Sequence, residues 1–140
     1  DCMPVSFDEG NKIADFISLH LPLNEKTKYL ITKKELSEMK KTCILVNTAR
    51  GGIINEDDLA WALQNQEIHS AGLDVFEQEP PKEKNPLFAL DNLILSPHSA
   101  ALTLECRKRM AIETCNNIAN YLNKSSDLIL SNIINKNILN

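Results

Sequence analysis

Short apolar runs alternate with helical segments along the chain, and this alternation restricts its possible folds more than any other feature. Each run has the length and composition of a buried strand. The runs span residues 15–20, 43–46, 70–75 and 92–95. Strands that alternate with helices predict βαβ units and a parallel sheet. The predicted fold class is therefore α/β, with flanking helices on a parallel sheet.

Capping residues predict the helices between and after these runs. A Thr or Asn side chain at such a position accepts hydrogen bonds from the first backbone N–H groups of a helix. The predicted caps and approximate ends are Thr32 to Lys40, Asn55 to Gln66, and Thr103 to Asn123. In the last helix, apolar residues at spacings of four, three and four predict a buried face. That face comprises Ala111, Cys115, Ile118 and Leu122.

The composition and charge of the chain argue against several functional classes. The 140 residues fit one domain, and a formal charge of −4 gives no electrostatic reason for binding nucleic acid or an anionic membrane. No apolar run approaches a membrane span, and no signal-peptide pattern begins the chain. The four cysteines form no CxxC pair, so we expect reduced thiols, no metal site and a cytoplasmic protein.

Chemistry-bearing side chains follow the predicted strands. Because the strands of βαβ units point the same way, their C-terminal ends share one edge, where open α/β sheets bind ligands. His20, Arg50, Asp74 and His98 each fall at or just after such an end. Arg50 is followed by two glycines that permit a sharp turn, and its guanidinium can hold a carboxylate through two parallel hydrogen bonds. The alternative is a turn with a solvated arginine.

Arg50, Glu79 and His98 form the most informative set. An arginine can hold a 2-oxo or 2-hydroxy acid, while a histidine donates a proton to the carbonyl as a hydride arrives. A nearby carboxylate such as Glu79 favours the protonated imidazole. Each residue also has a structural alternative: Glu79 as solvated loop charge, His98 as a turn histidine, and Asp74 as a turn cap. His69 precedes the third strand at the opposite edge, and we interpret it as structural.

Four stretches resemble the signatures of the D-isomer-specific 2-hydroxyacid dehydrogenases. This family includes phosphoglycerate, glycerate/hydroxypyruvate and D-lactate dehydrogenases, and the resemblance covers about residues 5–135. The stretches are Ala14–Leu23, Asn47–Gly52, Gly72–Pro80 and Ser96–His98. The resemblance implies a Rossmann-type sheet and hydride transfer between a nicotinamide cofactor and a small D-2-hydroxy or 2-oxo acid. It also implies a homodimer in the full-length protein.

The resemblance assigns roles to individual residues. Arg50 would bind the substrate, and Glu79 would orient His98 as the acid–base group. Asp74 would bind the nicotinamide carboxamide. No metal ligand is implied. The residues expected near the cofactor are His20, Leu21, Pro22, Asn47, Thr48, Ala49, Arg50, Asp74, His98 and Ala100.

The chain also departs from the family pattern. None of its four glycines forms the GxGxxG turn that binds the pyrophosphate, so the choice between NAD and NADP stays open. NAD is the cofactor that the resemblance implies. We expect residues 1–124 to be a partial NAD(P)-binding domain and residues 125–140 a tail toward a missing substrate domain. We expect this fragment alone to be inactive. Alternative classes are an NAD(H)-sensing corepressor-like protein of the same fold, a formate dehydrogenase, and a receiver or flavodoxin-like module.

Overall fold

The computed structural model describes residues 2–123 and 133–134. The chain divides into two compact units, residues 1–100 and 101–140. The expected tail, residues 125–140, lies outside the described residues apart from 133–134. The elements are α1 (Phe7–Ile13), β1 (Phe16–Leu19), α2 (Lys33–Glu38), β2 (Ile44–Asn47), α3 (Glu56–Gln64), β3 (Ser70–Leu73), the 3-10 helix η1 (Pro86–Ala89), β4 (Leu93–Leu95) and α4 (Leu104–Leu122).

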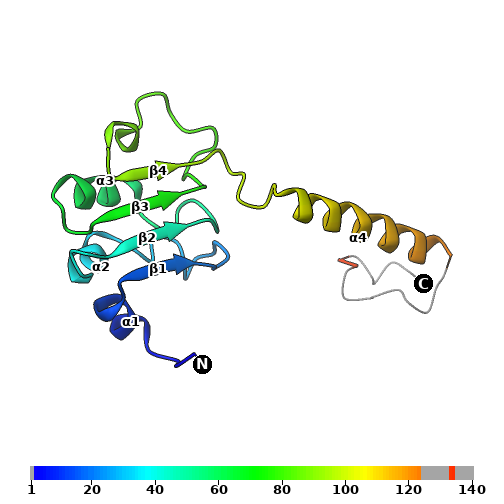
Figure 1. Ribbon diagram of the computed structural model, residues 1–140, viewed down its shortest axis with the longest axis horizontal. Helices are drawn as coiled ribbons and strands as arrows, with labels where there is room; N and C mark the ends of the chain where they lie inside the picture. Colours follow the sequence, from blue (N-terminus) through cyan, green and yellow to red (C-terminus); the bar gives the residue numbers. More distant parts are fainter. Residues whose placement is uncertain (1, 124–132, 135–140) are drawn as a thin grey trace. The chain divides into compact units, whose positions relative to one another are not determined.

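The first unit is built on a four-stranded parallel sheet in the order β1-β2-β3-β4. Figure 1 shows the strands side by side in chain order and pointing the same way. Their last residues are in register, because Leu19 pairs with Asn47, Asn47 with Leu73, and Leu73 with Leu95. The α/β class and the four predicted strands are therefore confirmed. The strands β1, β3 and β4 are shorter than predicted, and β2 begins and ends one residue later than predicted.

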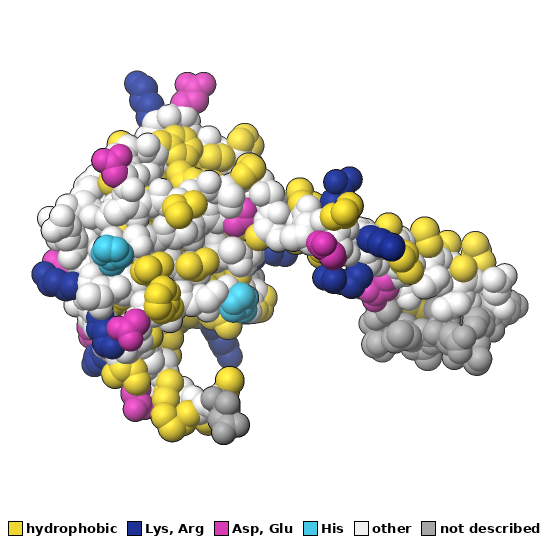
Figure 2. Space-filling view, in the orientation of Figure 1, with side chains coloured by type: hydrophobic (Ala, Val, Ile, Leu, Met, Phe, Trp, Pro, Cys, Tyr) yellow, Lys and Arg dark blue, Asp and Glu magenta, His cyan; other side chains and the backbone are white. Residues whose placement is uncertain are grey.

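The hydrophobic core lies between one face of the sheet and the helices α2 and α3. Alternate strand residues such as Leu45 and Leu73 are buried, as a period of two requires. They pack in one cluster with Leu36 of α2 and Leu59 of α3. The other face is less covered, with side chains such as Ile94 exposed. Figure 2 shows hydrophobic side chains gathered on the surface over the strands.

Local hydrogen bonds explain where the helices begin. The Glu35 carboxylate accepts from the backbone N–H of Thr32 at 3.0 Å, and Asn55 Oδ1 accepts from the Asp58 backbone N–H at 3.0 Å. Both predicted caps are confirmed. Sequence reasoning missed α1, although Ser6 and Glu9 have the same spacing as Thr32 and Glu35; Ser6 Oγ accepts from the Glu9 backbone N–H at 3.2 Å.

The helix α4 is capped as predicted, with Thr103 Oγ1 accepting from the Cys106 backbone N–H at 3.2 Å. The prediction that it buries one face is wrong: no residue of α4 is buried, and Ile118 and Leu122 are 56% and 71% exposed. Ala111 and Cys115 are exposed too. Helical spacing identifies an apolar face, but burial also requires another element to cover that face.

All four cysteines are free, and Cys43 is buried in the core as the sequence predicts. None of the helices in the described ranges is both long and apolar enough to cross a lipid bilayer. Residues 2–123 and 133–134 contain no group of three or more His, Cys, Asp or Glu side chains placed to hold a metal ion.

Candidate active site

The aligned strand ends bring the predicted site residues to one edge of the sheet. Parallel pairing places the four residues that follow the strands, His20, Thr48, Asp74 and Ser96, in a row. Backbone hydrogen bonds continue past the ends, since Asp74 N–H donates to Asn47 O at 3.0 Å and Ser96 N–H to Leu73 O at 2.9 Å. The edge is therefore ordered beyond the strands themselves.

The turn that carries Arg50 is held by Asn47. The Asn47 side chain is buried; its Oδ1 accepts from the Ala49 backbone N–H at 3.0 Å, and its Nδ2 donates to Arg50 O at 2.9 Å. The Asn47 amide is thus engaged by the turn. The Arg50 side chain is exposed, and its Nη1 donates to Ala49 O at 2.6 Å.

A cavity of about 630 Å³ lies beside this turn. Its lining includes six of the residues expected near a cofactor, three from the segment after β1 and three from the segment after β2. The lining residues are His20, Leu21, Pro22, Leu23, Thr48, Ala49 and Arg50. Cofactor sites are typically concave, largely apolar and about 300–1,000 Å³ in volume. The volume of this cavity lies in that range, and its lining combines apolar with polar side chains.

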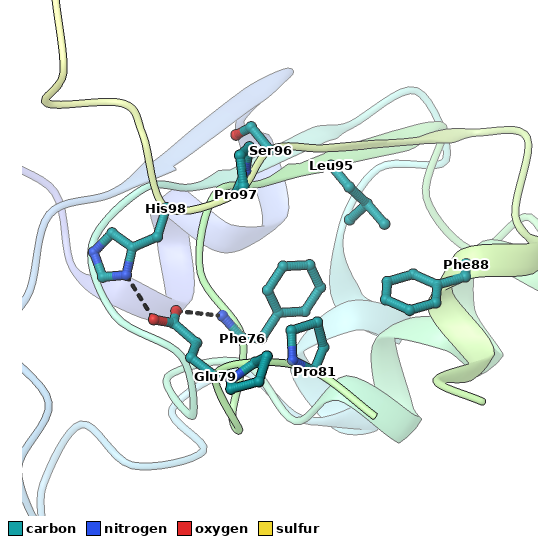
Figure 3. A pocket seen from close by; sticks show the side chains of 9 residues that line it. Phe76, Glu79, Pro81, Phe88, Leu95, Ser96, Pro97 and His98 are labelled. Atoms are coloured by element: carbon teal, nitrogen blue, oxygen red, sulfur yellow. Dashed lines mark hydrogen bonds and ion pairs between the residues drawn. The ribbon is translucent and has the colours of Figure 1, made fainter. Parts of the chain in front are cut away.

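Glu79 and His98 form a hydrogen-bonded pair, although 19 positions separate them in the sequence. The His98 Nδ1 lies 2.7 Å from Glu79 Oε2, and the backbone N–H of Phe76 donates to Glu79 Oε1 at 3.1 Å (Figure 3). The hydrogen bond with His98, and then the one from Phe76, lower the pKa of Glu79. Glu79 is therefore an anion at neutral pH and places a negative charge next to the His98 imidazole.

The turn around His98 is organised by Asp74, whose side chain is only 3% exposed. Its Oδ1 accepts from Ser96 Oγ and from the Ser99 backbone N–H, and its Oδ2 accepts from the Ala100 backbone N–H. His98 itself has φ of 52°, in the left-handed region that non-glycine residues seldom adopt. Burial alone would raise the pKa of Asp74, but these hydrogen bonds outweigh burial and lower it.

A second cavity, of about 440 Å³, lies beside the Glu79–His98 pair (Figure 3). Two of its rings, those of Phe76 and Phe88, meet edge to face with centroids 6.2 Å apart. Sequence reasoning found Glu79 and His98 but not the rest of the lining, which comes from four separate segments. The lining residues are Phe76, Glu79, Pro80, Pro81, Phe88, Leu95, Ser96, Pro97 and His98.

The two cavities have no lining residue in common, so the predicted residues fall into two groups. The Arg50 turn of the first group and the Phe76–Glu79 loop of the second come into contact at Gly51. A Cβ atom on Gly51 would lie 1.7 Å from the carbonyl oxygen of Phe76, so only glycine lets the Phe76–Glu77 peptide pack against the Arg50 turn. The backbone that precedes Glu79 thus lies directly against the residue that follows Arg50.

Comparison with known proteins agrees with this architecture. The model of the family described as D-isomer specific 2-hydroxyacid dehydrogenase, NAD binding domain, matches residues 1–100. The chain belongs to this family. The part of the family that it matches is the NAD-binding domain, which agrees with the parallel sheet and the cavity at its edge.

Individual members of the family are similar over most of this chain. A glyoxylate reductase of Aeropyrum pernix is 41% identical over 134 residues, 96% of this chain and 39% of the relative. A D-3-phosphoglycerate dehydrogenase of Methanocaldococcus jannaschii is 53% identical over 97 residues, 69% of this chain and 18% of the relative. The chain therefore spans less than half the length of these relatives.

Solved structures share the fold as well. The NAD-complexed D-isomer specific 2-hydroxyacid dehydrogenase from Lactobacillus delbrueckii ssp. bulgaricus superimposes with a TM-score of 0.81 at 32% identity. The superposition covers 86% of this chain and 41% of that protein. The Rossmann-type fold implied by the sequence motifs is thereby confirmed.

Asp74→Asn is expected to destabilise the fold. Asparagine has one acceptor oxygen in place of two, so its NH₂ group faces a backbone N–H and leaves that donor unpaired, at a cost of about 1–3 kcal/mol. Because the fold lowers the pKa of Asp74, the stabilisation is fully present above the unfolded-state value of about 3.9 and is lost as the pH falls through the folded-state value. Urea unfolding at several pH values measures this difference.

The exposed Asp91 provides the control for this measurement, because Asp91→Asn removes a carboxylate with no hydrogen bond in the described part of the chain. The free energy of unfolding should change little in Asp91→Asn. A loss in Asp74→Asn that stayed constant down to the most acidic pH would contradict the role given to the ionised carboxylate.

Gly51→Ala is expected to displace the Phe76–Glu77 peptide. The new Cβ would lie 1.7 Å from Phe76 O and 2.1 Å from its carbonyl carbon, so backbone must move. Overpacking of this kind costs about 1–3 kcal/mol. In Gly10→Ala, the matched control in α1, the new Cβ meets only Val5 Cγ2 at 3.4 Å. If chemical denaturation found the two variants equally stable, the close approach at Gly51 would be unimportant.

Proposed function

We propose that the full-length protein containing this chain is an oxidoreductase that transfers a hydride between NAD and a small D-2-hydroxy or 2-oxo acid. The Glu79–His98 pair carries this proposal. A histidine at the ligand-binding edge of a parallel sheet, in contact with a carboxylate, has the arrangement of a general acid–base group. The names of the relatives, glyoxylate reductase and D-3-phosphoglycerate dehydrogenase, support a hydroxy acid as substrate.

Each side chain has a distinct role in the proposed reaction. The exposed Arg50 guanidinium binds the substrate carboxylate and orients its carbonyl group. His98, whose Nδ1 is hydrogen-bonded with Glu79, donates a proton to the carbonyl oxygen during reduction and accepts it back during oxidation. The nicotinamide supplies or accepts the hydride. Asp74 holds the Ser96–Ala100 turn, so that His98 presents its imidazole in a fixed position.

The cavity beside the Arg50 turn is the proposed cofactor site. Leu21, Pro22 and Ala49 offer apolar surface to the flat rings of a dinucleotide, and Thr48 offers a hydroxyl group. His20 lines the same cavity, and its Nε2 is 2.8 Å from Ser18 Oγ. Asp74 follows β3 and accepts a hydrogen bond from the backbone N–H of Ala100 in the turn after β4, and Asn47 acts through the turn that it holds. NADP remains an alternative cofactor, and a cytoplasmic homodimer is part of the proposal.

His98→Asn in the full-length protein should slow the reduction of 2-oxo acids by about 10²–10⁴, the usual contribution of an acid–base group. NADH binding should change little, because the imidazole moves a proton and does not form the cofactor cavity. Turnover with glyoxylate and hydroxypyruvate, together with NADH fluorescence titration, measures the two effects. Turnover equal to the parent's would mean that His98 is not the proton donor.

Glu79→Gln is expected to shift the pH dependence in opposite ways for the two directions. An adjacent carboxylate stabilises the positive charge that a general acid carries, so without it reduction should lose activity on the alkaline side at lower pH. Oxidation needs the neutral imidazole and should extend to lower pH. Rates measured in both directions across the pH range test this expectation. Superimposable profiles for the parent and Glu79→Gln would mean that the Glu79 carboxylate is a solvated loop charge with no part in the proton transfer.

Arg50→Lys should mainly impair substrate recognition, because lysine keeps the positive charge but loses the planar fork that binds a carboxylate with two hydrogen bonds. We expect a raised KM for the 2-oxo acid and a nearly unchanged KM for NADH. Steady-state kinetics on a panel of 2-oxo acids tests this. An unchanged catalytic efficiency with every acid of the panel would mean that Arg50 does not bind the substrate carboxylate.

A further inference from the structure

Two carboxylates outside the site described above hold the loop that carries Glu79. Glu56 is the first residue of α3, and Glu77 lies in the loop after β3, 21 positions later. We propose that Glu56 and Glu77 are positioning residues that lock this loop so that Glu79 stays in contact with His98. The inference rests on the proposed function, since it concerns the orientation of the proposed acid–base pair.

The interaction between Glu56 and Glu77, called the lock below, is reciprocal. The backbone N–H of Glu56 donates to Glu77 Oε1 at 2.8 Å, and the backbone N–H of Glu77 donates to Glu56 Oε1. The carboxylate of each residue therefore accepts a hydrogen bond from the backbone N–H of the other. The geometry joins the first turn of α3 to the loop after β3, and a carboxylate at a helix N-terminus is also favoured by the partial positive charge of the exposed N–H groups.

Two further side chains engage the remaining carboxylate oxygens. Asn85 Nδ2 donates to Glu56 Oε2 at 2.8 Å, and the Tyr29 hydroxyl donates to Glu77 Oε2 at 3.0 Å. The hydrogen bond to Glu77, followed by the charge of Glu77, raises the pKa of Tyr29, so the phenol keeps its proton and remains a donor. All four oxygens of the two carboxylates thus accept a hydrogen bond, which fixes both side chains.

The lock acts on the backbone immediately before Glu79. The Phe76–Glu77 peptide lies against Gly51 on one side, and its N–H donates to Glu56. The backbone N–H of Phe76 donates to Glu79 Oε1, leaving Glu79 Oε2 for His98. A glutamate side chain has several rotatable bonds and is partly exposed here, so its orientation depends on the backbone that carries it. Fixing this peptide therefore fixes the carboxylate that meets His98.

The test compares four single substitutions and one double variant in the full-length protein. Glu77→Ala removes both acceptors. Glu77→Gln keeps an oxygen for the Glu56 N–H and an amide that can donate to the Tyr29 hydroxyl, so it serves as the conservative variant. Glu83→Ala is the matched control, because Glu83 is an exposed glutamate of the following loop with no hydrogen bond in the described part of the chain.

Glu77→Ala should lower kcat for 2-oxo acid reduction by about 10–100-fold, as expected when a catalytic group is misplaced by about 1 Å. The KM for NADH should stay close to the parent's. The alkaline side of the reduction profile should move to lower pH, in the same direction as for Glu79→Gln. Glu77→Gln should restore most of the activity, and Glu83→Ala should behave like the parent. Glu56→Ala should resemble Glu77→Ala, and the double variant should be no worse than either single one.

Assays are run well below the unfolding temperature of each variant, so that a lower stability alone cannot mimic a lower kcat. If Glu77→Ala loses only stability, with kcat and the pH profile unchanged, the inference is wrong while the roles of Glu79 and His98 stand. If Glu79→Gln and His98→Asn themselves turn over like the parent, the proposed function and the inference are both overturned.

Discussion

The in-register ending of the parallel strands is the constraint on which the site depends. Leu19, Asn47, Leu73 and Leu95 are paired across the sheet, so the chain leaves all four strands at the same level. The segments that follow then interlock through hydrogen bonds of their own, such as the one from Ser96 Oγ to Asp74. A slip of one residue in any strand would turn alternate side chains to the other face and separate these groups.

The loops at this edge are fixed by polar side chains that form hydrogen bonds with backbone groups. Asn47 holds the Arg50 turn, Asp74 holds the His98 turn, and the pair Glu56 and Glu77 holds the loop that bears Glu79. Loops carry the chemistry in many folds, but a loop without such anchors has many conformations. The order of the proposed acid–base pair therefore depends on these anchoring residues.

Local chemistry explains which predictions from the sequence were correct. Thr32, Asn55 and Thr103 cap helices because a cap requires only neighbouring backbone groups. Ser6 caps α1 by the same chemistry, so that helix was predictable and was overlooked. The apolar face of α4 was read correctly from its spacing, but its exposure could not be read, because periodicity carries no information about a covering partner.

The sequence by itself determined the α/β class, the strand order in the chain, and the identity of Arg50, Glu79 and His98 as candidate site residues. Short-range periodicity, capping and strand-end position suffice for these, as does the resemblance of four motifs to a family. Only the tertiary structure decided the 2.7 Å contact between Glu79 and His98, the engagement of Asp74 with the Ser96–Ala100 turn, and the lock between Glu56 and Glu77. Each of these joins segments about 20 residues or more apart. Their meeting depends on the packing of the strands and on the close approach of the Phe76–Glu77 peptide to Gly51, and no local sequence pattern predicts either.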